Sequence, residues 1–157
     1  MVRQALLIFV FGDFTNWEID LDYQMFRDSV NADSTWFWLE VDGLTPGEEY
    51  GMQYFIDEEI VIYEPYAELI LDEFNDQFIT ESVYPNLKEF PTGKANDLVS
   101  VISPGKPDYE WEVTDFQKPD KENIVIYELL VRDFLEDHSY SSIIDTLDYL
   151  DRLGINA

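Results

Sequence analysis

The chain has 157 residues, of which 46% are hydrophobic and 16% aromatic, so it carries enough apolar side chain for a packed core. Its 34 acidic and 9 basic residues give a formal net charge of -25 at pH 7, which repels nucleic-acid phosphates and acidic membrane surfaces and argues against both as partners. It has no cysteine, which excludes a disulfide framework. Its single histidine, His138, argues against a histidine-rich metal site and against a Ser-His triad.

The amino-terminal part predicts an all-β domain. The opening run MVRQALLIFVF imitates a signal peptide, but it has no small-residue cleavage site and continues directly into GDFTNW, so we predict a strand there. No apolar stretch is long enough to span a bilayer. From Leu6 to about Tyr66, short apolar segments alternate with turn residues, which is typical of an antiparallel sandwich. We place this domain at residues 1–67.

The stretch TWFWLEV alternates in polarity within this domain. One face carries Phe37, Leu39 and Val41, and the other carries Trp36, Trp38 and Glu40. The glycines and proline of DGLTPGEEY then supply a turn, and YGMQYFI begins the next strand. The pattern predicts that Trp36 and Trp38 point away from the core.

Residues 68–123 have a different character. Prolines at positions 85, 91, 104, 107 and 119 interrupt short apolar pieces. This pattern predicts an extended connector that lies over a neighbouring domain.

Residues 124–157 predict the beginning of a βαβ arrangement. The run IVIYELLV is typical of a parallel strand that is covered on both faces. A helical stripe follows at Ile143, Leu147 and Leu150, with Ser139 or Ser141 as its N-cap and Gly154 just past its end. The last residues read as the start of a further strand, so we expect the chain to be a piece of a longer protein.

Five short motifs in this order resemble those of glycoside hydrolase family 13, the α-amylase family. VFGDFTNW, GLTPGEEY and EPYA are similar to parts of the family's N-terminal immunoglobulin-like domain, the carbohydrate-binding module of type 48. IYELLVRDF resembles the first strand of the catalytic barrel, and LDYLDRLGINA resembles the first helix and the entry to the second strand. The resemblance covers most of the chain.

The resemblance implies a mainly β fold: an immunoglobulin-like (E-set) β-sandwich, the extended connector, and a truncated βα piece of a (β/α)8 barrel. Such a barrel has about 250 residues, so only its beginning is expected here. Relatives place glycine after the aspartate of the hairpin that matches FIDEEIVI, where this chain has Glu58. We therefore predict either a positive φ at Glu58 or a different turn.

No catalytic residue is expected in this chain. The resemblance implies that the catalytic carboxylates lie on later barrel strands, and hydrolysis with retention needs two carboxylates about 5 Å apart. Glu128 and Asp133 are about 16 Å apart along a strand and on opposite faces, so they are not that pair. The loop LEDHSYSS lacks the Asp-x-Asn-x-Asp calcium pattern of some relatives, and we expect neither a metal nor a cofactor.

At the carboxyl end of the first barrel strand lie Arg132, Asp133 and Phe134, where barrels build their active sites. In the intact enzyme these residues are candidates for the border of the cleft. The alternative, which we favour, is a structural Arg-Asp pair that orients the loop. Leu130 stands where many relatives have histidine.

Sugar binding by a β-sandwich uses exposed aromatic faces, and the candidates are Trp17, Trp36 and Trp38. The favoured alternative is that these tryptophans contact the rest of the parent enzyme or pack within the sandwich. The predicted function is that of an accessory region of an enzyme acting on α-glucans such as starch or glycogen, with weak glucan binding. A free-standing carbohydrate-binding or protein-interaction module remains the alternative. Expected protein partners are the missing barrel and, through residues 124–157, a second copy of the chain.

Overall fold

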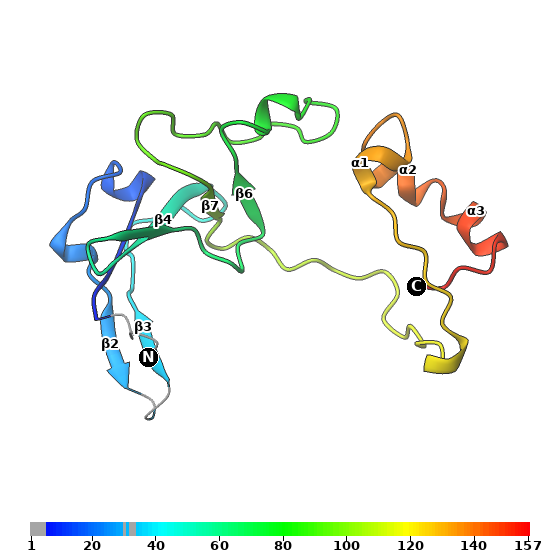
Figure 1. Ribbon diagram of the computed structural model, residues 1–157, viewed down its shortest axis with the longest axis horizontal. Coiled ribbons are helices and arrows are strands. Elements are labelled where there is room, and N and C mark those ends of the chain that lie inside the picture. Colours follow the sequence, from blue (N-terminus) through cyan, green and yellow to red (C-terminus); the bar gives the residue numbers. More distant parts are fainter. Residues whose placement is uncertain (1–5, 30, 32–33) are drawn as a thin grey trace. The chain divides into compact units, whose positions relative to one another are not determined.

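The computed structural model describes residues 6–29, 31 and 34–157, and they form two compact units (Figure 1). The first unit takes in Met1–Ile79 and Asn86–Pro107, and the second takes in Thr80–Pro85 and Asp108–Ala157. Strands lie only in the first unit and α-helices only in the second, within the described residues. The fold is mainly β, as the sequence predicts.

The first unit is built around a five-stranded antiparallel sheet. Its strands are β1 (Ile8–Gly12), β4 (Tyr50–Ile56), β5 (Ile60–Ile62), β6 (Leu69–Leu71) and β7 (Val99–Ile102). The order is β1-β4-β7-β6, and β5 pairs with the end of β4 beyond β7. The long strand β4 is therefore the centre of the sheet, because three other strands pair with it.

A second, two-stranded antiparallel sheet consists of β2 (Phe26–Ser29) and β3 (Thr35–Trp38). In the sequence, β2 and β3 come between β1 and β4. A bridge between Phe9 and Gln24 and a 2.8 Å hydrogen bond from Met25 N to Ile8 O connect this sheet to β1. The two antiparallel sheets, with no α-helix between them, are consistent with a β-sandwich-like domain.

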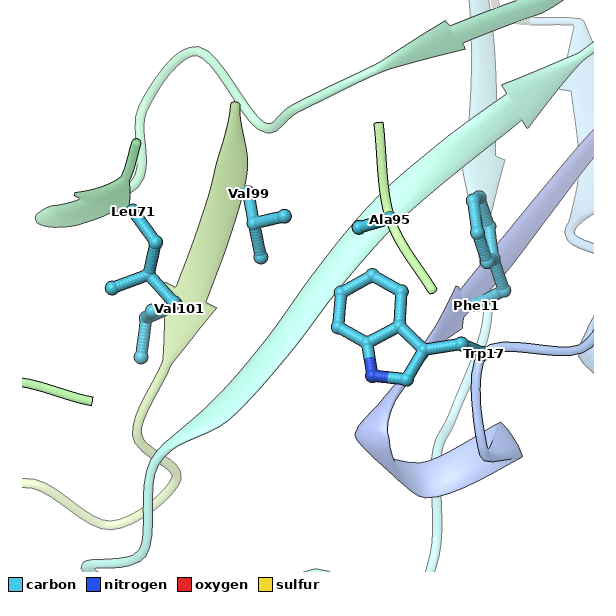
Figure 2. Packing of buried hydrophobic residues seen from close by; sticks show 6 residues of the cluster. All are labelled: Phe11, Trp17, Leu71, Ala95, Val99 and Val101. Atoms are coloured by element: carbon cyan, nitrogen blue, oxygen red, sulfur yellow. The ribbon is translucent and has the colours of Figure 1, made fainter. Parts of the chain in front are cut away.

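The core of the first unit is a cluster of six buried side chains (Figure 2). They are Phe11, Trp17, Leu71, Ala95, Val99 and Val101. Leu71 and Val99 are completely buried, and Phe11 meets Trp17 edge to face at 6.0 Å between ring centroids. Strands β6 and β7 thus supply half of the core.

This arrangement corrects the expected connector. We placed the end of the β-domain at residue 67, whereas β6 and β7 belong to its sheet. The prolines that suggested a connector all lie outside β7. The carbonyl of Pro104 accepts a hydrogen bond from Gly47 N at 2.7 Å. Buried Gln53 of β4 also donates to the carbonyls of Asn96 and Leu98, at 2.6 and 2.8 Å, and so holds the approach to β7 in place.

Short 3-10 turns complete the β-unit and begin the second unit. They are η1 (Asp13–Thr15), η2 (Leu21–Tyr23), η3 (Asp76–Phe78) and η4 (Lys121–Asn123). In η2 the side chain of Asp20 caps the turn, accepting a hydrogen bond from Asp22 N at 3.0 Å. The turns η1 and η2 lie between β1 and β2, and η3 lies in the long segment between β6 and β7.

The second unit contains α1 (Val131–Phe134), α2 (Tyr140–Ile144) and α3 (Leu147–Arg152). The single helix predicted after Ser139 is divided into α2 and α3. Ser139, one of the two predicted N-caps, is the N-cap of α2, and its side chain accepts a hydrogen bond from Ser142 N at 3.2 Å. At the division, Thr146 Oγ1 donates to Ser142 O at 2.7 Å, a backward bond of the kind that bends helices. Gly154 follows α3 with a φ of 80°, as predicted for that position.

Residues 124–130 form no regular strand, in contrast to the prediction, although the backbone is extended at Ile124 and Leu130. They do pair with the last residues: Tyr127 N donates to Ala157 O at 2.9 Å, and Ala157 N donates to Val125 O at 3.2 Å. This alternation is the hydrogen-bond pattern of parallel strands. Ile126 is nevertheless 75% exposed, so the segment is not covered on both faces in this chain.

Candidate functional site

The outer face of the two-stranded sheet gathers exposed aromatic rings. Phe26 pairs with Trp38 and Asp28 pairs with Trp36, and residues opposite each other in an antiparallel pair share a face. The exposed fractions are 68% for Trp36, 59% for Phe26 and 48% for Trp38. We call this set of four residues, Phe26, Asp28, Trp36 and Trp38, the aromatic face.

Trp38 is held in a fixed orientation on this face. Its ring lies against that of Phe26 with 4.8 Å between centroids and a tilt of 30°. Its indole Nε1 donates a hydrogen bond to Asp28 Oδ2 at 2.9 Å. Because two neighbours fix the ring before any ligand arrives, Trp38 loses little conformational freedom on binding.

The outward orientation of Trp36 and Trp38 matches the alternation of their sequence. The intervening Phe37 is half-buried, as is Leu39 beyond the end of the strand. The strand itself is shorter than the predicted TWFWLEV segment and ends at Trp38. The sequence did not point to Phe26 or Asp28, because their place on the face follows from the register with β3 and FRDS carries no alternation of its own.

Trp17, the third predicted stacking residue, is buried with 8% of its surface exposed and belongs to the core. Its Nε1 donates to Asp13 Oδ1 at 2.9 Å. A Cβ atom at Gly51 would lie 3.1 Å from the indole ring, so the glycine of β4 leaves room for it. Trp17 has no free ring face to offer a sugar, and we withdraw it as a candidate.

The cleft-border candidates Arg132, Asp133 and Phe134 lie on α1, directly after the extended segment. Arg132 Nε contacts Asp133 Oδ1 at 3.0 Å, and both side chains are largely exposed. The hydrogen bond from Arg132 lowers the pKa of Asp133, which therefore stays ionised. The structure thus contains the Arg-Asp pair that was the alternative interpretation. A place at a catalytic cleft stays a prediction.

The described part of the chain contains no group of three or more His, Cys, Asp or Glu side chains arranged to hold a metal ion. In that same part, no helix has both the length and the apolar character needed to cross a membrane.

No protein-family model matches the chain. It is similar to the malto-oligosyltrehalose trehalohydrolase of Saccharolobus solfataricus, with 26% identity over 135 residues. The alignment covers 86% of this chain and 19% of the relative, so the chain spans about a fifth of the length of the curated relative it matches. This likeness supports a relationship to a carbohydrate-active enzyme at a coarse level.

Proposed function

We propose that this chain is an accessory region of a family 13 glycoside hydrolase that acts on α-glucans, and that the aromatic face binds the glucan. The observation that carries the proposal is the set of three exposed aromatic rings around one carboxylate on a small antiparallel sheet. Aromatic rings stack on the apolar faces of pyranose rings, and polar neighbours bind the hydroxyl groups. The name of the similar enzyme supports the α-glucan class, because it refers to a malto-oligosaccharide derivative.

In this proposal the chain does not perform catalysis itself. The reacting carboxylates belong to parts of the parent enzyme outside residues 1–157, as the family resemblance implies. The pairing of Tyr127 with Ala157 in a parallel pattern agrees with the beginning of a βα-barrel. The accessory region would hold a glucan chain near the enzyme and raise its local concentration.

Titration with maltoheptaose tests the proposal. We expect saturable binding with a Kd in the order of millimolar, because an open platform encloses little of the ligand. Replacing Trp36 or Trp38 by alanine removes a stacking ring, so we expect W36A and W38A to lose detectable binding by calorimetry and by retention on immobilised glycogen.

Trp111 provides a matched control, because it is a tryptophan of the second unit that is 74% exposed. The variant W111A should bind maltoheptaose as the unaltered chain does. Binding that persists in W36A and W38A but disappears in W111A would move the site away from the aromatic face. If neither the unaltered chain nor any of the three variants binds maltoheptaose, the competing role is favoured, in which the aromatic face contacts another part of the parent enzyme.

A further inference from the structure

Asp28 occupies a central position on the aromatic face. It lies directly across from Trp36 and two residues from Phe26 along β2, so its carboxylate stands among the three rings. Its Oδ2 accepts the hydrogen bond from Trp38 Nε1. Among the described residues, Oδ1 has no hydrogen-bond partner, and the side chain is exposed.

An ionised carboxylate only accepts hydrogen bonds, so the solvent-exposed Oδ1 can accept one from a donor of the ligand. The hydroxyl groups of a sugar ring stacked on Trp36 are donors at the edge of that ring. A hydrogen bond from a hydroxyl to a carboxylate is charge-assisted and is stronger than a bond between neutral groups.

The same charge repels anionic ligands. Arg27, the neighbouring cation on β2, follows the strand alternation to the opposite face and pairs with Phe37, so it does not offset Asp28 on the aromatic face. The net charge of -25 adds a repulsive field over the whole chain.

We propose that Asp28 is a binding residue of the aromatic face and makes it selective for neutral saccharides over uronic-acid or phosphorylated ones: one carboxylate oxygen fixes Trp38, and the other accepts a sugar hydroxyl. This inference rests on the proposed function and specifies the ligand of the same site.

The test compares the unaltered chain, D28N and E59Q as ligands are added, with calorimetry for affinity and nuclear Overhauser contacts between the Phe26 and Trp38 rings for the position of Trp38. Asparagine at position 28 keeps an oxygen for Trp38 Nε1 but replaces the second acceptor by an amide donor. We expect maltoheptaose to bind D28N roughly three- to tenfold more weakly, while the nuclear Overhauser contacts between the Phe26 and Trp38 rings of the free protein persist. Glu59 is an exposed acid in the turn between β4 and β5, so E59Q removes the same charge elsewhere and should bind as the unaltered chain does.

The outcomes separate the two proposals. If the unaltered chain does not bind maltoheptaose, the proposed function itself fails. If it binds and D28N matches it within twofold, the role of Asp28 is wrong and the stacking function stands. If the affinity of D28N falls and the contacts between the Phe26 and Trp38 rings are lost as well, Asp28 acts by positioning Trp38, and the sugar contact is overturned. Oligogalacturonate should not bind the unaltered chain; an affinity equal to that for maltoheptaose would overturn the selectivity.

Discussion

Three donors converge on the carboxylate of Asp13 in the first unit. Gly51 N donates to Oδ2 at 2.7 Å, Trp17 Nε1 donates to Oδ1 at 2.9 Å, and Lys88 Nζ lies 3.0 Å from Oδ2. Burial by itself would raise the pKa of Asp13, but the hydrogen bonds from Gly51, Lys88 and Trp17 and the charge of Lys88 together hold it below its ordinary value. The residue thus joins η1, β4 and the segment before β7.

We predict that D13N lowers the free energy of unfolding by about 1–3 kcal/mol at pH 7, because an amide nitrogen would face the donors that the carboxylate now satisfies. The pKa of Asp13 is lower in the folded than in the unfolded chain, so its ionised form stabilises the fold above about pH 4, and this contribution is lost as the pH falls through the folded-state pKa. Urea unfolding at pH 7 and pH 3 should show the difference between the two proteins shrinking at low pH. D42N, at an exposed acid, should change stability by less than about 0.5 kcal/mol. An equal difference at both pH values would contradict the role of Asp13.

The hairpin between β4 and β5 is an element whose turn carries backbone strain. Asp57 and Glu58 have φ values of 51° and 58°, and Glu59 N donates to Ile56 O at 3.0 Å. Both central residues therefore have the left-handed conformation of a type I′ turn. The prediction of a positive φ at Glu58 is confirmed. Asp57 has a further role, since its Oδ1 accepts from Leu6 N and Leu7 N at 2.8 and 2.9 Å and anchors the start of β1.

Replacing Glu58 by glycine should stabilise the first unit by about 0.5–1 kcal/mol. A side chain with a Cβ pays for the left-handed conformation, and glycine does not, although glycine also gives the unfolded chain more freedom. Glu59, the next residue, does not have a positive φ, so E59G should instead destabilise the protein by a similar amount. Thermal unfolding of the two variants side by side checks the prediction, and a gain from both or from neither would show that strain at Glu58 is not the cause.

At the scale of the whole molecule, local patterns predicted what depends on neighbours in sequence. The β character, the outward Trp36 and Trp38, the cap at Ser139 and the glycine after α3 follow from alternation and turn chemistry. Long-range pairing was not predictable from the sequence alone. Trp17 is buried because Gly51 leaves space for it, and Phe26 and Asp28 join the aromatic face only through the register of β2 with β3. Strands β6 and β7 have three and four residues, too few to show a period, and they are recognisable only by their pairing with each other and with β4.

The division into two units makes a prediction about where the β-domain ends. A version of the chain ending at Pro107 keeps the seven strands found in the described residues, whereas a version ending at Ala67, the boundary predicted from the sequence, lacks β6 and β7. The shorter version would lose Leu71, Val99 and Val101 from the core, each of which contributes roughly 1.5–3 kcal/mol through burial, and a typical domain has only about 5–15 kcal/mol in total. We therefore expect a cooperative thermal transition and a fixed near-ultraviolet signal from buried Trp17 for residues 1–107, and neither for residues 1–67. Within the longer version, L71A should lower the free energy of unfolding by about 2–5 kcal/mol, because this completely buried side chain would leave a cavity. Cooperative unfolding of residues 1–67 would restore the boundary at residue 67, and its loss from residues 1–107 would mean that the first unit needs residues 108–157 to fold.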